Sequence, residues 1–262
     1  MARIIAVANQ KGGVGKTTTT INLAASLALA KQRVLLVDVD PQGNLTSGVG
    51  QKGKPSAAGT IYEALTSADP SADATPFIIP TCLAGLDLIP ADRNLTGAEI
   101  ELVTLPQREE RVRVLLSRIG DQYEYVFIDC PPSLGLLTLN ALVAADAVLI
   151  PLHCEYFALE GLADLVGTMR RVRAALNPAL DIEGVLLTMF DERTNLGQQV
   201  ATEVRGFFKE KVFRTVIPRN VRLGEAPSHG LPVILYDVKS RGAEAYMALA
   251  REVLERSTAT AA

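Results

Sequence analysis

Residues 11–18 read KGGVGKTT, directly after the apolar segment Arg3–Ala8 and at the start of the helical pattern Thr17–Ala30. The backbone N–H groups of a glycine-rich turn can converge on the closely spaced charges of a phosphate chain, because no side chains block the approach. The pattern predicts that Lys16 reaches the β- and γ-phosphates of a nucleotide and that the Thr17 hydroxyl holds Mg²⁺. The other nucleotide-binding residues expected on this loop are Lys11, Gly12, Gly13, Val14, Gly15 and Thr18.

The loop departs in two ways from the usual phosphate-loop pattern, G-x-x-x-x-G-K-[ST]. Gln10 occupies the position of the first glycine, and Lys11 adds a second lysine. Two ammonium groups on so short a loop repel each other unless an anion lies between them. The second lysine therefore strengthens the prediction of a phosphate site.

Two further apolar segments end in carboxylates. Residues 34–42 read VLLVDVDPQ and carry Asp38 and Asp40, and residues 125–132 read YVFIDCPP and carry Asp129. Residues two apart on a strand face the same side, so Asp38 and Asp40 can both face the phosphate loop. A carboxylate at the end of such a strand is suited to hold Mg²⁺ directly or through water, although alone it could also be a helix or turn cap.

Apolar segments rich in β-branched residues alternate with longer helical patterns, and several are apolar at nearly every position, as in strands covered on both faces. This alternation predicts an α/β fold with a doubly wound, mostly parallel sheet and helices on both faces. We expect one domain over residues 1–256 and a tail over residues 257–262. The expected strands are Arg3–Ala8, Arg33–Asp38, Leu86–Pro90, Tyr125–Asp129, Ala147–Leu152, Ile182–Thr188 and Val212–Ile217, and the expected helices are Thr17–Ala30, Leu134–Ala144, Ala158–Leu176, Leu196–Lys209 and Gly242–Arg256.

The composition is that of an ordinary globular protein, with 48% hydrophobic and 21% charged residues among 262. The formal net charge of −3 means that any nucleic-acid contact must come from a local basic patch. The sequence begins without a signal-peptide pattern, and its three cysteines form no C-x-x-C pair. We therefore expect a cytoplasmic protein without a disulfide framework.

Three segments, KGGVGKTT, LLVDVDPQGN and FIDCPPSLGLLTLNAL, resemble the ParA/MinD superfamily of deviant P-loop ATPases in their order and separation. Three later segments, CEYFALEGL, GVLLTMFDERTNLG and VIPRNVRLGEAPSHGLPVILYDVKSRGAEAY, are similar to the chromosomal ParA/Soj family in particular. The resemblance runs from Arg3 to about Leu254, and we expect the short type that lacks an added DNA-binding domain before the P-loop.

The resemblance implies a Mg²⁺-dependent ATP hydrolase that is slow alone, with ATP sandwiched between two subunits. In such a homodimer Lys11 would act in trans, with Gly12 at the dimer interface, and Asp40 would position the attacking water beside Lys16. Asp38 would support Mg²⁺ together with Thr17 and Asp129. The adenine would lie against Met189, Pro218 and Asn220.

The segment from Arg193 to Arg241 has a local excess of positive charge, because it contains nine basic residues and four acidic ones. A solvated charged face is one interpretation of this composition. The resemblance implies instead that Arg193 and Arg222 bind double-stranded DNA without sequence preference, with Arg219, Lys239 and Arg241 as further candidates. Since no helix-turn-helix or zinc pattern is present, the contacts should be to phosphates. The resemblance also implies a ParB/Spo0J-type partner that stimulates hydrolysis, association with the nucleoid, and a role in chromosome or plasmid segregation.

Three other classes share parts of this pattern. A MinD-like membrane ATPase needs a C-terminal amphipathic helix rich in lysine, whereas this chain ends ALAREVLERSTATAA, so we expect no membrane partner. An iron–sulfur reductase needs cysteines at cluster spacing, which Cys130 and Cys154 do not show. A metabolic amidoligase or kinase has no evident acceptor signature here. His153 and His229 are isolated and fit structural roles.

Overall fold

The computed structural model describes residues 2–54, 56–67, 69, 73–155 and 158–261. Its centre is a seven-stranded sheet in the order β3-β4-β2-β5-β1-β6-β7, in which every pairing is parallel except that of β3 with β4. The expected α/β fold with a mostly parallel sheet is confirmed. The strands are β1 (Arg3–Val7), β2 (Val34–Asp38), β3 (Ile79–Pro80), β4 (Leu86–Ile89), β5 (Tyr125–Asp129), β6 (Ala147–His153) and β7 (Asp181–Thr188).

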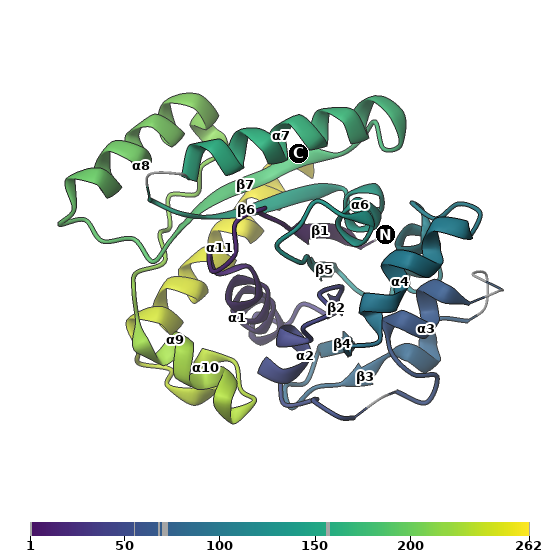
Figure 1. Ribbon diagram of the computed structural model, residues 1–262. Coiled ribbons are helices and arrows are strands. Elements are labelled where there is room, and N and C mark those ends of the chain that lie inside the picture. The colour runs from purple at the N-terminus through teal and green to yellow at the C-terminus, as the bar shows by residue number, and fades with distance from the viewer. Residues whose placement is uncertain (1, 55, 68, 70–72, 156–157, 262) are drawn as a thin grey trace.

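Helices cover both faces of the sheet (Figure 1). Alternation along β1 shows why: Ile5 and Val7 belong to the core layer beneath α1 and α11, whereas Ala6 belongs to the layer beneath α6 and α7. Because successive strand residues point to opposite faces, a fully apolar strand supplies both layers at once. The longer helices are α1 (Lys16–Leu29), α6 (Leu136–Ala144), α7 (Ala158–Ala175), α8 (Asn195–Phe208) and α11 (Arg241–Ala261).

The strand register brings the predicted site residues to one edge of the sheet. Asp129 at the end of β5 pairs with Asp38 at the end of β2 on one side and with Val7 at the end of β1 on the other. The phosphate loop follows Val7 directly. Ligand sites of open α/β sheets lie at the carboxyl ends of the strands, and this edge is where the loop and both carboxylates meet.

The segment Val212–Ile217 is not a strand, contrary to the sequence prediction. The Phe213 N–H donates to β7 at 3.0 Å, but the N–H groups of Arg214 and Thr215 both donate to the Glu252 carboxylate at 2.9 Å. Glu252 lies on α11, so these bonds hold the segment off a regular ladder. The segment still covers the outer edge of β7, which protects that edge from pairing with another chain.

The sequence patterns also miss short elements and one end. The unpredicted helices have too few residues to show a 3.6-residue period. Instead of a tail after Arg256, α11 continues to Ala261, with the Ser257 hydroxyl donating to the Val253 carbonyl at 3.0 Å; Ala262 lies outside the described residues. No helix within the described ranges is long and apolar enough to cross a membrane. The short helices are α2 (Asn44–Gly48), α3 (Ile61–Thr66), α4 (Leu95–Glu101), α5 (Arg111–Ser117), α9 (Val221–Glu225) and α10 (Val233–Tyr236).

Candidate active site

The loop between β1 and α1 turns at two glycines and leads directly into a helix. Gly13 and Gly15 have φ angles of 72° and 87°, a left-handed region that residues with a Cβ rarely adopt. α1 begins at Lys16, so the free N–H groups of its first turn lie at the loop, where the helix dipole also favours an anion. The Thr188 hydroxyl at the end of β7 donates to the Val14 carbonyl at 2.8 Å and so holds the loop against the end of the sheet.

Lys16 is a buried cation, with 7% of the residue exposed. Its Nζ donates to the Lys11 carbonyl at 3.1 Å. Burial lowers the pKa of Lys16, and the carboxylates of Asp129 and Asp40 oppose that shift only in part. A phosphate on the loop would supply the negative charge that this ammonium group needs.

Two buried carboxylates form the floor of the site. Asp129 accepts hydrogen bonds from the Thr17 hydroxyl at 2.7 Å and the Thr20 hydroxyl at 3.2 Å, and Asp38 accepts from the hydroxyl and N–H of Thr46 at 2.7 and 2.9 Å. Burial, followed by the nearby Asp38 charge, raises the pKa of Asp129 to about 8. Burial also raises the pKa of Asp38 to about 6. A cation beside these groups would reverse both shifts.

The oxygen atoms at this site suit Mg²⁺, which needs few protein ligands, better than they suit a metal ion that is bound entirely by protein side chains. No group of three or more His, Cys, Asp or Glu residues in the described part of the chain could hold a metal ion by itself. Mg²⁺ keeps several waters and is usually bound by one or two protein oxygens plus substrate phosphates. Thr17 can supply such an oxygen at the loop, and Asp129 and Asp38 can accept hydrogen bonds from the metal's waters.

The raised pKa of Asp129 predicts how the nucleotide-free protein responds to pH. The unfolded carboxyl loses its proton near pH 3.8, whereas the folded one keeps it to about pH 8. Stability is therefore lost as the pH rises through this window. Asparagine does not ionise, so Asp129→Asn should not show the loss of stability that Asp129 causes as the pH rises. Its free energy of unfolding at pH 8.5 should exceed that of wild type by about 1–3 kcal/mol. Urea unfolding in EDTA at pH 6 and pH 8.5 measures it, and equal pH dependence in both proteins would contradict the assignment.

A cavity of about 750 Å³ opens above the loop. It brings the loop residues together with Asp40, which is 6% exposed and accepts from the Gln42 N–H at 2.9 Å. Met189 lines the cavity with φ of 48°, a strained angle for a side chain of that size. The candidates that line the cavity are Gly12, Gly13, Gly15, Lys16, Thr17, Thr18, Asp40, Met189, Pro218 and Asn220.

Other lining residues escape the motif reasoning. Gln42, Asn44 and Ser47 follow Asp40 closely, and a polar run directly after a strand-end carboxylate is a signal that could have found them. Tyr246 carries no such signal, because it reaches the cavity from α11, where its hydroxyl lies 3.1 Å from Thr19 Oγ1. Arg219, a DNA candidate, also lines the nucleotide cavity.

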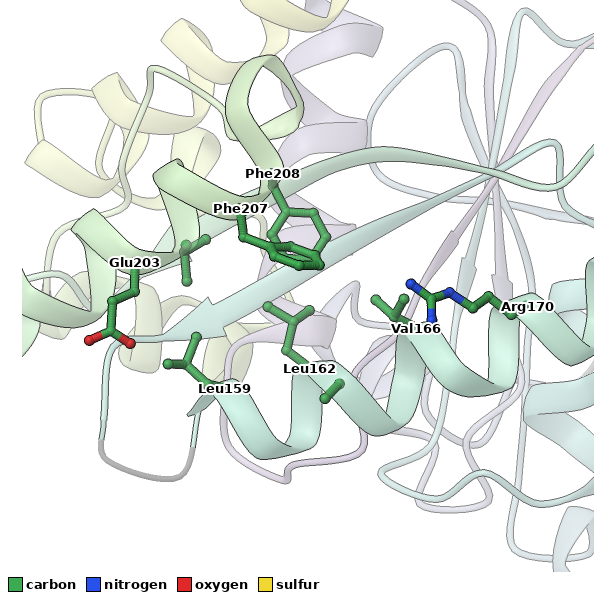
Figure 2. Close-up of a pocket in the computed structure, with 9 residues that line it drawn as sticks. Leu159, Leu162, Val166, Arg170, Glu203, Phe207 and Phe208 are labelled. Atoms are coloured by element: carbon green, nitrogen blue, oxygen red, sulfur yellow. The ribbon is translucent and has the colours of Figure 1, made fainter.

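An apolar groove between α7 and α8 is a separate feature (Figure 2). Its volume is about 410 Å³, and Leu162 from α7 and Phe207 from α8 point into it, with Glu203 and Arg170 at opposite ends. It shares no lining residue with the nucleotide cavity. Because the groove lies apart from the glycine loop and its lining is apolar except for Glu203 and Arg170, we assign it no part in the nucleotide chemistry.

The two leading DNA candidates carry acidic partners in their own chain. Arg193 donates to both carboxylate oxygens of Asp191, at 2.9 and 2.7 Å. Arg222 pairs with Glu225 at 2.7 Å and with Asp237 at 3.3 Å. Both arginines are exposed, so a phosphate can reach them but must compete with these carboxylates. Lys239 and Arg241 are exposed at the start of α11.

The similarity to known proteins decides the family. The AAA domain model matches residues 2–182. The chromosome partitioning protein ParA of Myxococcus xanthus is 58% identical over 258 residues, which cover 98% of this chain and 90% of that protein. The chain belongs to the ParA/Soj family of chromosome-partitioning proteins. Soj of Bacillus subtilis, a sporulation initiation inhibitor protein, is also 58% identical, over 97% of this chain and 98% of its own.

Solved structures agree with the fold. Cobyrinic acid a,c-diamide synthase from Mycobacterium smegmatis, crystallised with an ATP analogue and magnesium, matches with a TM-score of 0.84 and 36% identity, over 98% of this chain and 96% of that one. The partition proteins confirm the ParA/Soj resemblance expected from the motifs, and the synthase structure confirms the doubly wound fold.

Proposed function

We propose that this family member is a Mg²⁺-dependent ATPase whose ATP-bound homodimer binds DNA without sequence preference and whose hydrolysis releases it. One arrangement supports the proposal. The Thr17 hydroxyl donates a hydrogen bond to Asp129, and the neighbouring residue Lys16 is a buried cation. Thr17 and Lys16 both line the same cavity as the glycines of the loop. This combines a phosphate cradle, a positive charge and an oxygen set suited to Mg²⁺ within one site.

The chain's own residues have distinct roles in this chemistry. Phosphoryl transfer depends on positioning and charge stabilisation rather than on covalent catalysis. Bound Mg²⁺ would neutralise charge on the β- and γ-phosphates. Lys16 would hold the same oxygens, and Asp40, fixed by the Gln42 N–H, would orient the attacking water. The adenine would contact Pro218, Asn220 and Met189, which also line the cavity.

Hydrolysis would depend on the dimer. In the ATP sandwich, Lys11 of each subunit would reach the phosphates in the other, in the manner of an arginine finger supplied by a partner. Gly12 would lie at the interface, where its missing side chain permits close approach. An isolated subunit should then hydrolyse ATP slowly, and ATP binding, assembly and activity form one linked equilibrium.

DNA binding would connect this cycle to segregation. The exposed arginines Arg193 and Arg222, with Lys239, Arg241 and Arg219, would contact phosphates of any sequence and place the ATP-bound dimer on the nucleoid. A ParB/Spo0J-type protein would stimulate hydrolysis and so release the dimer, on a chromosome or a plasmid. This assignment draws on the partition proteins that are 58% identical over nearly the whole chain.

An ATP-dependent amide-forming enzyme is the second candidate, because the synthase structure is similar over nearly the full length. The two functions predict different ligands. A synthase would need a small carboxylic acid acceptor and would be indifferent to duplex DNA, whereas the partition ATPase requires DNA and no acceptor. The higher identity to partition proteins favours the latter.

Arginine substitutions test the DNA surface. Arg193→Ala and Arg222→Ala should each weaken binding to every duplex sequence alike and leave ATP affinity unchanged. Each lost phosphate contact should reduce the slope of log affinity against log salt by about 0.9. Fluorescence anisotropy with two unrelated duplexes between about 50 and 200 mM salt measures both quantities.

Arg33→Ala is the matched control for these variants. Arg33 is also an exposed arginine that pairs with a carboxylate, that of Glu124 at 2.8 Å. It directly precedes the first residue of β2, whereas Asp38 is the last residue of that strand, so Arg33 lies at the end of the strand away from the candidate site. The slope of log affinity against log salt for Arg33→Ala should equal that of wild type. A strong preference for one duplex, or equal slopes for all four proteins, would contradict the proposed surface.

A further inference from the structure

The second lysine of the loop has a partner within its own subunit. Lys11 Nζ forms an ion pair with Glu155 Oε2, and Glu155 Oε1 lies 2.9 Å from His153 Nδ1. Glu155 follows the end of β6 and precedes α7, far from the loop in sequence. The Lys11 side chain is 35% exposed and that of Glu155 is 47% exposed, so the pair lies at the surface and can open without disturbing the core.

The Lys11 backbone is held independently of this ion pair. Its N–H donates to Asn9 Oδ1 at 3.0 Å, while Asn9 Nδ2 donates to the Pro151 carbonyl of β6 at 2.8 Å. The Lys11 carbonyl accepts from Lys16 Nζ at 3.1 Å. Loss of Glu155 would therefore free the ammonium group and leave the loop in place.

The contact of Glu155 with the first residue of α7 is made by its backbone. The Glu155 carbonyl accepts from the Ala158 N–H at 2.9 Å, and glutamine in its place would keep that backbone bond. The hydrogen bond from Lys11, the largest effect, lowers the pKa of Glu155, so the carboxylate is charged at neutral pH. Burial lowers the pKa of His153, which leaves Lys11 as the principal positive partner of Glu155 at neutral pH.

A single ammonium group cannot pair with Glu155 in its own subunit and bind a phosphate in a partner subunit at the same time. We propose that Glu155 is a positioning residue that holds Lys11 in the unassociated subunit and so restrains assembly of the ATP-bound dimer. This inference rests on the trans role of Lys11 in the proposed function. Each dimer must open two such pairs, and an exposed pair shifts an equilibrium by about 1.4- to 5-fold, so removing both should favour the dimer by about 2- to 30-fold.

Glu155→Gln tests the inference, with Glu160→Gln as the matched control. Glu160 is an exposed glutamate in the first turn of α7, so its substitution removes the same charge close by. Sedimentation velocity with Mg²⁺ and a non-hydrolysable ATP analogue should give a dimer association constant about 2- to 30-fold above wild type for Glu155→Gln. Glu160→Gln should match wild type. Equal values for both variants and wild type would overturn the proposal.

A second measurement shows whether Glu155 acts through Lys11. The rate at which acetic anhydride labels the Lys11 amine in the nucleotide-free protein, read by mass spectrometry, should rise in Glu155→Gln but not in Glu160→Gln, with exposed Lys52 as the internal reference. A stronger dimer without faster Lys11 labelling would overturn the proposal, as would faster labelling without a stronger dimer. If instead Lys11→Ala assembles and hydrolyses ATP like wild type, the trans lysine of the proposed function fails first.

Discussion

The Asp40→Ala variant is expected to bind ATP and Mg²⁺ normally and to remain a dimer on DNA, because it cannot complete hydrolysis. Asp40 lines the cavity, and an ionised carboxylate has no hydrogen to donate to a phosphate. In the proposed mechanism its loss would therefore remove the group that orients water and no donor to the nucleotide. Loss of a positioned base typically slows such a step by about 10²- to 10⁴-fold. A ligand that binds the dimer more tightly than the single subunit draws the population toward the dimer, and without hydrolysis nothing reverses that shift.

Gel filtration with ATP, followed by DNA retention over time, tests both parts of this expectation. Asp40→Asn is the near-isosteric companion: it keeps an oxygen that can accept from the Gln42 N–H but loses the charge, and it should behave like Asp40→Ala. A ParB-type activator should release wild type from DNA and neither variant. An ATP-bound monomer, or wild-type phosphate release, would remove Asp40 from the catalytic role.

The Lys16→Ala variant should lose ATP and ADP binding by at least about 100-fold. Charge-assisted hydrogen bonds contribute about 1.5–3 kcal/mol each, and Lys16 is placed to make them with two phosphates. The folded protein should tolerate the change, because the buried ammonium has a lowered pKa and its hydrogen bond is to the Lys11 carbonyl. Isothermal titration calorimetry measures the affinity, and the melting temperature reports the fold.

Two companion variants interpret the Lys16→Ala result. Lys16→Arg keeps the charge but replaces the compact ammonium with a planar guanidinium, so it should also bind ATP weakly if the narrow loop requires a lysine. Lys52→Ala removes an exposed lysine and should have no effect. Near wild-type ATP affinity in Lys16→Ala would rule out the phosphate-loop assignment.

The sequence was most informative where one physical requirement fixes the residue type. A strand covered on both faces must be apolar throughout, so β5 has the bounds Tyr125–Asp129 in both the prediction and the structure. Val212–Ile217 is also predicted as a strand from its apolar and β-branched residues, although Arg214 and Thr215 interrupt the apolar run, and it is not a strand in the structure. The side chain of Glu252, from a helix far along the chain, takes two of its N–H groups, and no local pattern reveals such a competitor.

The same limit applies to the site. The glycine loop and the strand-end carboxylates could be predicted because strand ends converge in a parallel sheet. The Lys11–Glu155 pair depends on the pairing of β1 with β6, and the position of Tyr246 depends on the packing of α11 against α1. Local periodicity encodes neither of these long-range contacts. Arg219 shows the same problem: the family resemblance makes it a DNA candidate, yet its position in the fold also places it in the lining of the cavity above the glycine loop.

In the proposed cycle, ATP switches this protein onto DNA of any sequence. Binding of wild type to a random-sequence duplex, measured by anisotropy with Mg²⁺ and ATP, with Mg²⁺ and ADP, and without nucleotide, tests it most directly. We expect tight binding only in the condition with Mg²⁺ and ATP; salt should weaken it strongly, and a second, unrelated duplex should bind equally well. Equal binding in all three conditions, or none with ATP, would contradict it.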